Sequence, residues 1–315
     1  MQYRVLGRTN LKASLISFGS GGHSRMGQST GKSEAQSRDV VRKALDLNIN
    51  LIDSSEMYGT EELVGQAVQA AGISRSELIF SSKAGLYQDK RLKTAAELEQ
   101  SLIGSLKRLK TDYLDIYHLH AVRPDDYAYA VSELVPAMEK FRQSGKIRFI
   151  GITEGFSSDP SHQMLRKAVQ DDFWDVMMVG FNLLNQSARD RVLVPAQAKN
   201  VGILDMFAVR KALISSQNLA SRLKKLGERG QVDLDRFNLE APLSDLLCES
   251  DCGSLTELAY RFCAGEPGIH SVLCGTGNPD HLAMNAKDIL HGALPEKVRQ
   301  QLMSLFQAVD SISGD

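Results

Sequence analysis

Eight short apolar segments recur along the chain, and this repeat restricts the possible folds more than any other feature of the sequence. The segments are Leu15–Gly19, Ile49–Asp53, Leu78–Ser81, Tyr113–His118, Ile147–Ile152, Asp175–Val179, Val201–Met206 and Ile269–Cys274. The first seven begin roughly 25 to 35 residues apart, which is the length of a strand, a helix and two loops. Their apolar residues are continuous rather than alternating, which is typical of parallel strands covered on both faces.

Helical patterns lie between these segments. Thr94 and Glu97 form a capping box, and the leucines that follow recur at helical spacing. These leucines are Leu98, Leu102, Leu106 and Leu109. We expect further helices after Thr60 and over residues 129–141 and 281–290. Eight strands that alternate with helices predict an α/β protein with a closed (β/α)8 TIM barrel.

Two stretches interrupt the repeat. Residues 3–14, YRVLGRTNLKAS, predict a β-hairpin that closes the bottom of the barrel. Residues 210–254 form a long insertion between the seventh and eighth strands, with a helix near 216–226. The insertion fits either a lid or substrate loop on the active-site face or a solvated surface excursion. No linker divides the chain, so we expect a single barrel domain over residues 1–315.

Composition narrows the classes of function. Lysine and arginine number 37 against 38 aspartates and glutamates, and the net charge of −1 argues against a nucleic-acid partner. The chain lacks both an amino-terminal apolar segment and an apolar run long enough to span a bilayer, so we expect a cytoplasmic protein without a membrane partner. Cys248 and Cys252 have no further ligands nearby in the sequence, so we expect no metal site.

Four polar residues follow three successive predicted strands, where barrels carry their active sites. They are Asp53, Tyr58, Lys83 and His120. A buried lysine beside a tyrosine is expected to lower the phenol's pKa from about 10, so that Tyr58 acts as a general acid or base. Asp53 would compensate the charge of Lys83. Such a set donates a proton to an oxygen while hydride arrives at carbon.

Two histidines compete for the remaining role in this set. His118 and His120 are two apart on a strand, so both side chains point the same way. The histidine nearer the carboxyl-terminal end of the strand is closer to the expected site. We therefore favour His120 as the group that hydrogen-bonds and polarises a substrate carbonyl.

A phosphate-binding segment is expected after the eighth strand. The chain has no GxGxxG motif in a strand–turn–helix context, which argues against a Rossmann domain. Barrels instead bind phosphate with the last strand loops and a helix amino terminus. Gly275, Thr276 and Gly277, with a helix that begins near Pro279, fit this arrangement.

Taken together, these segments resemble the aldo/keto reductase family over essentially the whole chain. The stretches that carry the resemblance are MQYRVLGRTNLKASLISFGSGG, NLIDSSEMYG, SSKAG, YLDIYHLH, GKIRFIGIT and LCGTGNPDHLAMN. The resemblance implies a (β/α)8 barrel that binds a nicotinamide cofactor, usually NADPH, and reduces carbonyls reversibly. It also implies that Asp53, Tyr58, Lys83 and His120 form a catalytic tetrad.

The chain departs from the family pattern where the nicotinamide is expected to lie. Thr153 and Glu154 replace the usual Ser-Asn pair after the fifth strand, and Met178 stands where glutamine is usual. Met206 and Phe207 occupy the segment in which a tyrosine often stacks on the ring. We expect these five residues to contact the cofactor, with Met178 packing on the ring.

The choice between NADPH and NADH stays open. A 2′-phosphate is usually bound by arginine or lysine, and residues 275–285 contain neither. His281 stands near the position where the family often has arginine. We expect Gly275 to Gly277, His281 and Asn285 to contact the cofactor phosphates.

Two functions remain in competition. The first is an NAD(P)-dependent oxidoreductase that acts on an aldehyde, a ketone or a sugar-type carbonyl or alcohol. The second is a nucleotide-binding regulatory or binding subunit with little or no turnover, which the altered ring contacts suggest. The intact tetrad favours the enzyme. The substrate's identity, the direction of the reaction and the oligomeric state are not predicted.

Overall fold

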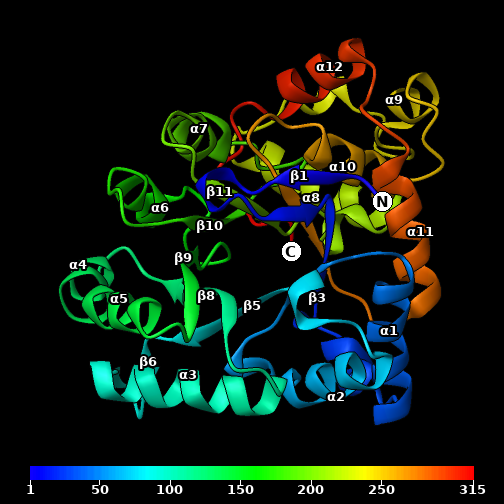
Figure 1. Cartoon of the computed structure of the whole chain (residues 1–315). Coiled ribbons are helices and arrows are strands. Elements are labelled where there is room, and N and C mark those ends of the chain that lie inside the picture. The colour runs from blue at the N-terminus through cyan, green and yellow to red at the C-terminus, as the bar shows by residue number, and fades with distance from the viewer.

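Eight parallel strands form a closed barrel in the computed structural model, which describes residues 1–315 (Figure 1). In order around the barrel, the strands are β3 (Ile16–Gly19), β4 (Leu51–Asp53), β5 (Ile79–Gly85), β8 (Leu114–Val122), β9 (Ile147–Glu154), β10 (Val176–Gly180), β11 (Gly202–Met206) and β12 (Ser271–Cys274). β12 pairs with β3, and this contact closes the ring. The predicted (β/α)8 barrel is therefore confirmed, with one strand at each of the eight apolar segments.

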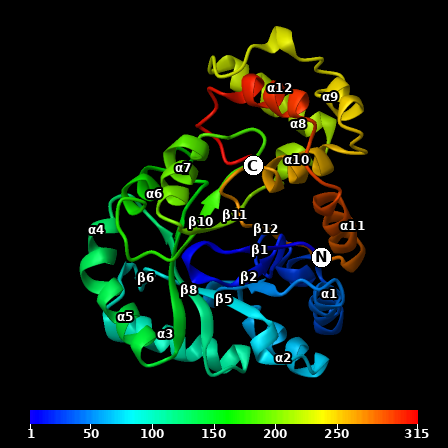
Figure 2. The ribbon, with the colours of Figure 1, turned by 45° about the horizontal axis from the view of Figure 1, so that its top comes forward.

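Helices surround the barrel (Figures 1 and 2). They are α1 (Glu34–Asp46), α2 (Glu61–Ala71), α3 (Ala95–Leu109), α4 (Tyr127–Tyr129), α5 (Val135–Gln143), α6 (Gln163–Ala168), α7 (Val194–Ala198), α10 (Leu255–Ala264), α11 (Pro279–Leu290) and α12 (Glu296–Phe306). The predicted capping box begins α3, because the Thr94 side chain accepts a hydrogen bond from the Glu97 amide. A π turn joins α4 to α5 ahead of Pro136, whose missing N–H removes one ordinary helical hydrogen bond. None of the helices combines the length and hydropathy that a membrane span requires.

The amino-terminal hairpin closes one end of the barrel, as predicted. β1 (Tyr3–Val5) and β2 (Lys12–Ser14) pair antiparallel. Leu6 and Leu11, between them, are buried in the apolar cluster inside the barrel. A Cβ atom on Gly202, the first residue of β11, would lie 2.7 Å from Leu6 Cγ, so glycine lets the hairpin approach the start of this strand.

Two strands extend beyond their predicted ends, and this moves two candidate residues. β5 continues to Gly85 and β8 to Val122, so Lys83 and His120 lie within strands rather than after them. The ladder continues because Lys83 pairs with His118 and Gly85 pairs with His120. The backbone hydrogen bonds of a parallel ladder do not require apolar side chains, so the change to polar residues does not end the strand.

The insertion between β11 and β12 divides into two parts. Near its start, Arg210, Lys211 and Ile214 line the cavity described below. Its remainder forms α8 (Ser216–Glu228) and α9 (Ser244–Glu249), which lie with α12 beyond one side of the barrel (Figure 2). Three leucines of α8 are buried, namely Leu219, Leu223 and Leu226. The start of the insertion therefore lies at the cavity, and the rest is a packed layer rather than a solvated excursion.

Candidate active site

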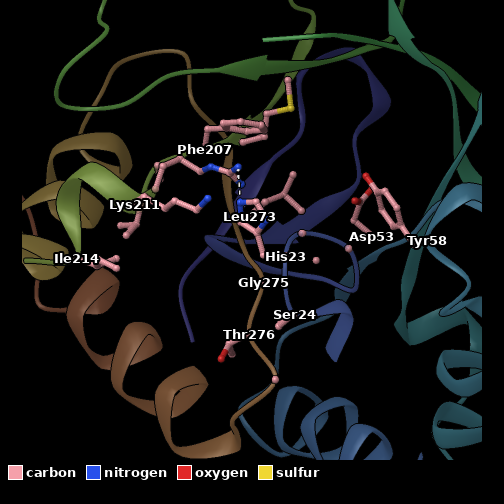
Figure 3. Close-up of a pocket in the computed structure, with 18 of the residues that line it drawn as sticks. His23, Ser24, Asp53, Tyr58, Phe207, Lys211, Ile214, Leu273, Gly275 and Thr276 are labelled. Carbon is pink, nitrogen blue, oxygen red and sulfur yellow. Dashed lines mark hydrogen bonds between the residues drawn. The ribbon is translucent and has the colours of Figure 1, made fainter. Parts of the chain in front are cut away.

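A cavity of about 410 Å³ opens where β4 and β11 end (Figure 3). Eight of the residues predicted for the site line it: Asp53, Tyr58, Met178, Met206, Phe207, Gly275, Thr276 and Gly277. Figure 3 shows Asp53 and Tyr58 at one end of the cavity, with Lys211 and Ile214 at the other. The cavity thus lies at the carboxyl ends of the strands, where barrels carry their active sites.

Asp53 and Lys83 form a buried ion pair at the floor of this site. Lys83 Nζ lies 2.5 Å from Asp53 Oδ2 and donates to the Ser54 carbonyl at 2.7 Å. The Ser81 hydroxyl donates to the second carboxylate oxygen, Asp53 Oδ1, at 2.7 Å. Burial is the largest influence and disfavours the ammonium group, but Asp53 and Tyr58 together raise the pKa of Lys83. Lys83 therefore carries a positive charge next to the Asp53 carboxylate.

Tyr58 lies beside this charge, on a 3₁₀ turn that follows β4. Lys83 Nζ is 5.0 Å from the centroid of the Tyr58 ring. A Cβ atom on Gly21 would lie 2.5 Å from the other side of the ring, so the ring fits only against glycine. Contrary to the sequence-based expectation, the pKa of Tyr58 is raised: burial outweighs the opposing influence of Lys83, and Asp53 adds to the rise. The phenol is therefore protonated at neutral pH.

His120 points its ring at the same phenol. Its Nε2 atom lies 3.4 Å from the Tyr58 hydroxyl, and its Nδ1 atom lies 3.1 Å from Ser55 Oγ. Burial, with the nearby charge of Lys83, lowers the pKa of His120 to about 3. The imidazole is therefore neutral at physiological pH.

His118 lies deeper in the barrel than His120. It is fully buried, and its Nε2 atom is 3.1 Å from the Ser81 hydroxyl. A Cβ atom on Gly151, its cross-strand neighbour, would lie 2.2 Å from the imidazole, so this glycine makes room for the ring. Burial lowers the pKa of His118 well below its usual value. The structure thus brings His120, and not His118, to Tyr58.

The apolar candidates form one wall of the cavity. Met178, Met206 and Phe207 all line it. Phe207 has a φ of 72°, a left-handed conformation that costs a bulky residue of the order of 1–3 kcal/mol. Asn182 donates to the Phe207 carbonyl at 3.3 Å, and Arg210 lies over the Phe207 ring. The turn that carries this aromatic ring into the cavity is therefore held from both sides.

Thr153 and Glu154 lie elsewhere. Both are buried, and neither lines the cavity. Thr153 Oγ1 accepts from the amide of Ala121 at 2.7 Å and so supports the irregular turn of β8 directly after His120. The structure therefore gives Thr153 an internal hydrogen bond at the place where a carboxamide contact was predicted.

The Glu154 carboxylate is also used internally. It accepts from the Gly180 amide at 2.8 Å and lies 2.9 Å from His162 Nδ1. Burial raises the pKa of Glu154, although His162 and the Gly180 amide oppose the change. The side chain is tied between β9, β10 and the residue that precedes α6, which leaves it turned away from the cavity.

The segment after β12 gives the opposite wall. Gly275, Thr276 and Gly277 line the cavity, whereas His281 and Asn285 do not. His281 is exposed on α11, and Asn285 donates to Cys274 Sγ at 3.1 Å. The Asn278 side chain caps α11, so the amino terminus of this helix lies immediately behind the glycine-rich segment. Backbone N–H groups of this kind favour an anion.

A charged bridge that sequence spacing could not reveal includes two residues that line the cavity, Arg210 and His23. Arg210 donates to Asp315 through Nε and Nη2 at 2.9 and 2.6 Å. The same guanidinium lies 3.1 Å from His23 Nε2, an interaction drawn in Figure 3. The bridge joins the segment after β3 to the segment after β11. The sequence suggested only that the insertion could lie at the active-site face, because nothing in it indicates a pairing 105 residues away.

The sequence also did not predict a group of buried hydroxyls near the ion pair. Ser20 Oγ lies 2.9 Å from Ser54 Oγ and 2.8 Å from Thr60 Oγ1, and all three side chains are buried. The signal for them is weak, since a serine at a strand end usually belongs to a turn. No group of three or more His, Cys, Asp or Glu side chains is arranged to hold a metal ion.

Comparison with known proteins extends these findings. The aldo/keto reductase family profile matches residues 16–306. L-galactose dehydrogenase of Arabidopsis thaliana is 29% identical over 294 residues, which cover 90% of this chain and 87% of that protein. A probable voltage-gated potassium channel subunit beta of Oryza sativa subsp. japonica is 26% identical over 332 residues, which cover 95% of this chain and 94% of that protein.

A solved structure shares the fold. The holo form of an aldo-keto reductase from Bacillus halodurans superposes with a TM-score of 0.73 at 23% identity, covering 99% of this chain and 98% of that one. The family match spans nearly the whole barrel, and the resemblance inferred from the sequence is confirmed. The chain belongs to the aldo/keto reductase family and is an oxidoreductase of that type.

Proposed function

We propose that the protein transfers hydride reversibly between a nicotinamide cofactor and an aldehyde, a ketone or a sugar-type carbonyl or alcohol, with Tyr58 as the general acid and base. One observation carries the proposal. The Tyr58 hydroxyl, the His120 imidazole and the Asp53–Lys83 pair meet at one end of the cavity. A proton donor, a hydrogen-bonding group and a fixed positive charge therefore surround the place where a carbonyl oxygen would lie.

The chemistry follows from the state of each group. A bound nicotinamide would supply hydride to the carbonyl carbon, and Tyr58 would give its proton to the developing alkoxide. The charge of Lys83, 5.0 Å from the ring, stabilises the phenolate that remains. Asp53 holds Lys83 in place at 2.5 Å. Neutral His120 hydrogen-bonds the same oxygen without competing for its proton. In oxidation the phenolate removes the proton from the alcohol.

The residues that line the cavity support a dinucleotide as its ligand. Met178, Met206 and Phe207 offer an apolar wall for a nicotinamide ring, and Gly275 to Gly277 offer backbone N–H groups for phosphate. Lys211 lines the cavity, while residues 275–285 contain no cation. The 2′-phosphate of NADPH would have to bind a cation outside residues 275–285, such as Lys211. We therefore propose both NADPH and NADH as cofactors.

A second function has specific support. Glu154 and Thr153 are tied into internal hydrogen bonds, so the carboxamide contacts differ from the usual family pattern. The resemblance to a probable voltage-gated potassium channel subunit beta agrees with the alternative of a regulatory or binding subunit. The intact tetrad supports the enzyme more strongly. The resemblance to L-galactose dehydrogenase makes sugar-type alcohols the first substrates to test.

Two measurements on the purified protein test the proposal. Calorimetric titration with NADPH and with NADH measures the affinity for each dinucleotide. Loss of reduced-nicotinamide absorbance is then followed with a panel of aldehydes, ketones and aldoses, and its gain with sugar alcohols and aldoses. Binding with turnover supports the oxidoreductase. Binding without turnover on any member of the panel would favour the regulatory subunit, and failure to bind either dinucleotide would contradict both functions.

A further inference from the structure

Ser55 lies between the backbone of Lys83 and the ring of His120, and it is fully buried. Its hydroxyl oxygen is 3.1 Å from His120 Nδ1 and 3.2 Å from the Lys83 carbonyl oxygen. It also accepts from the Met57 amide at 3.3 Å, which fixes the turn that carries Tyr58. One hydroxyl group thus contacts three segments of the proposed site.

The hydroxyl has a single proton, and this limits the protonation of His120. The Met57 amide can only donate and the Lys83 carbonyl can only accept. If Ser55 donates to Lys83, then His120 must carry its proton on Nδ1, which leaves Nε2 bare. If Ser55 donates to Nδ1, the proton of the neutral imidazole lies on Nε2. The rotation of one hydroxyl is therefore coupled to the tautomer of the histidine.

A carbonyl substrate can bind to only one of the two tautomers of His120. A carbonyl oxygen beside Tyr58 offers only lone pairs, so His120 can bind it only through an Nε2–H group. We infer that Ser55 is a positioning residue that donates its proton to His120 Nδ1 and thereby presents Nε2–H to the substrate oxygen. This role rests on the proposed function, since it requires that a carbonyl binds next to Tyr58.

The other histidine on β8 provides an internal comparison. His118 Nε2 also faces a serine hydroxyl, that of Ser81, at 3.1 Å. The Ser81 proton is already donated to the carboxylate of Asp53 at 2.7 Å. His118 must therefore donate from Nε2, whether or not a substrate is bound. The hydroxyl proton of Ser81 is therefore fixed on Asp53, whereas the hydroxyl proton of Ser55 can point either to His120 or to the Lys83 carbonyl.

The tautomer can be measured directly. Protein labelled with ¹⁵N-histidine is saturated with the oxidised form of the dinucleotide that binds, and acetone is added as an unreactive carbonyl. Long-range ¹H–¹⁵N spectra then report which nitrogen of each ring is protonated. In this complex we expect Nε2–H at His120 in the wild type and in Ser55→Thr, and a mixture of tautomers in Ser55→Ala. His118 should show Nε2–H in all three proteins.

Kinetics give a second readout. Ser55→Ala should lower kcat/KM for carbonyl reduction about tenfold, the effect of one lost hydrogen bond, and leave dinucleotide affinity unchanged. Ser55→Thr should recover most of the loss. Nδ1–H at His120 in the wild-type complex, or the same tautomer in the Ser55→Ala complex, would overturn the role of Ser55. Absence of wild-type turnover would instead sink the proposed function, and this role with it.

Discussion

The two sides of the site are built differently. Around β4, β5 and β8, polar atoms are fixed by short contacts, such as Lys83 to Asp53 at 2.5 Å and Ser81 to Asp53 at 2.7 Å. Around β9 to β12, the cavity is lined by methionines, Phe207 and glycine backbone, while Glu154 is tied internally. The proposed proton-transfer side thus depends on charge and hydrogen bonding, and the proposed cofactor side depends on shape and backbone groups.

Loss of the central charge should have the largest effect on stability. In Lys83→Met the Asp53 carboxylate remains buried at 3% exposure without its counter-ion. We expect the free energy of unfolding to fall by about 3–5 kcal/mol, as for other buried pairs that lose one partner. Chemical denaturation measures the change.

A double variant provides the control. Lys83→Met with Asp53→Asn removes both charges, so it should be more stable than Lys83→Met alone. A single variant within about 1 kcal/mol of the wild type would mean that the pair is not held in the described geometry.

A substitution that overpacks the proposed proton-transfer side should lower the free energy of unfolding by less than the loss of Lys83. The Cβ atom of Gly151→Ala would lie 2.2 Å from the His118 ring, so a strand or the imidazole must shift. We expect a loss of about 1–3 kcal/mol in the free energy of unfolding. Gly253→Ala is the matched control in the insertion, because its new Cβ atom meets nothing closer than 3.7 Å. Equal effects of the two changes would contradict the close packing at His118.

Neutral histidines on the proton-transfer side predict a pH dependence. The pKa of His120 is about 3 in the folded protein, because of burial and Lys83, against about 6.5 in an unfolded chain. As pH falls through this interval, the unfolded chain binds a proton that the folded protein does not, so the free energy of unfolding decreases. His118, whose pKa burial lowers, adds in the same direction.

Urea denaturation between about pH 7 and about pH 4 measures this slope. His120→Asn should make the slope shallower. The exposed His281→Asn on the cofactor side is the control and should leave it unchanged. An unaltered slope in His120→Asn would show that this imidazole is protonated in the folded protein.

The smallest effect is expected at the charged bridge on the cofactor side. Asp315 pairs with Arg210, which lines the cavity, and both side chains are partly exposed. Asp315→Asn should leave Arg210 free for a cofactor phosphate and raise dinucleotide affinity by roughly two- to fivefold, the range of a partly exposed ion pair. Calorimetry measures the change, and Arg210→Ala should act in the opposite direction. Weaker dinucleotide binding by Asp315→Asn would mean that the bridge maintains the shape of the cavity, and that Asp315 does not compete with the cofactor phosphate for Arg210.

The sequence predicted the proton-transfer side better than the cofactor side, for physical reasons. Each strand–helix repeat is encoded by one continuous stretch of sequence. The spacing of the apolar segments therefore predicts the barrel and the positions of Asp53 and Lys83. Side-chain direction is not local: Glu154 turns to His162 and the Gly180 amide, partners that spacing does not indicate. The pKa of Tyr58 was predicted in the wrong direction because the sequence indicates a neighbouring charge but not the extent of burial.

The central claim is that Tyr58 supplies the proton while the rest of the cavity binds the dinucleotide. Tyr58→Phe removes one hydroxyl and keeps the ring against Gly21. We expect kcat for carbonyl reduction to fall by about 10²- to 10⁴-fold, while the dinucleotide affinity measured by calorimetry stays unchanged. Wild-type turnover in Tyr58→Phe, or a loss of turnover that only follows lost dinucleotide binding, would contradict the account.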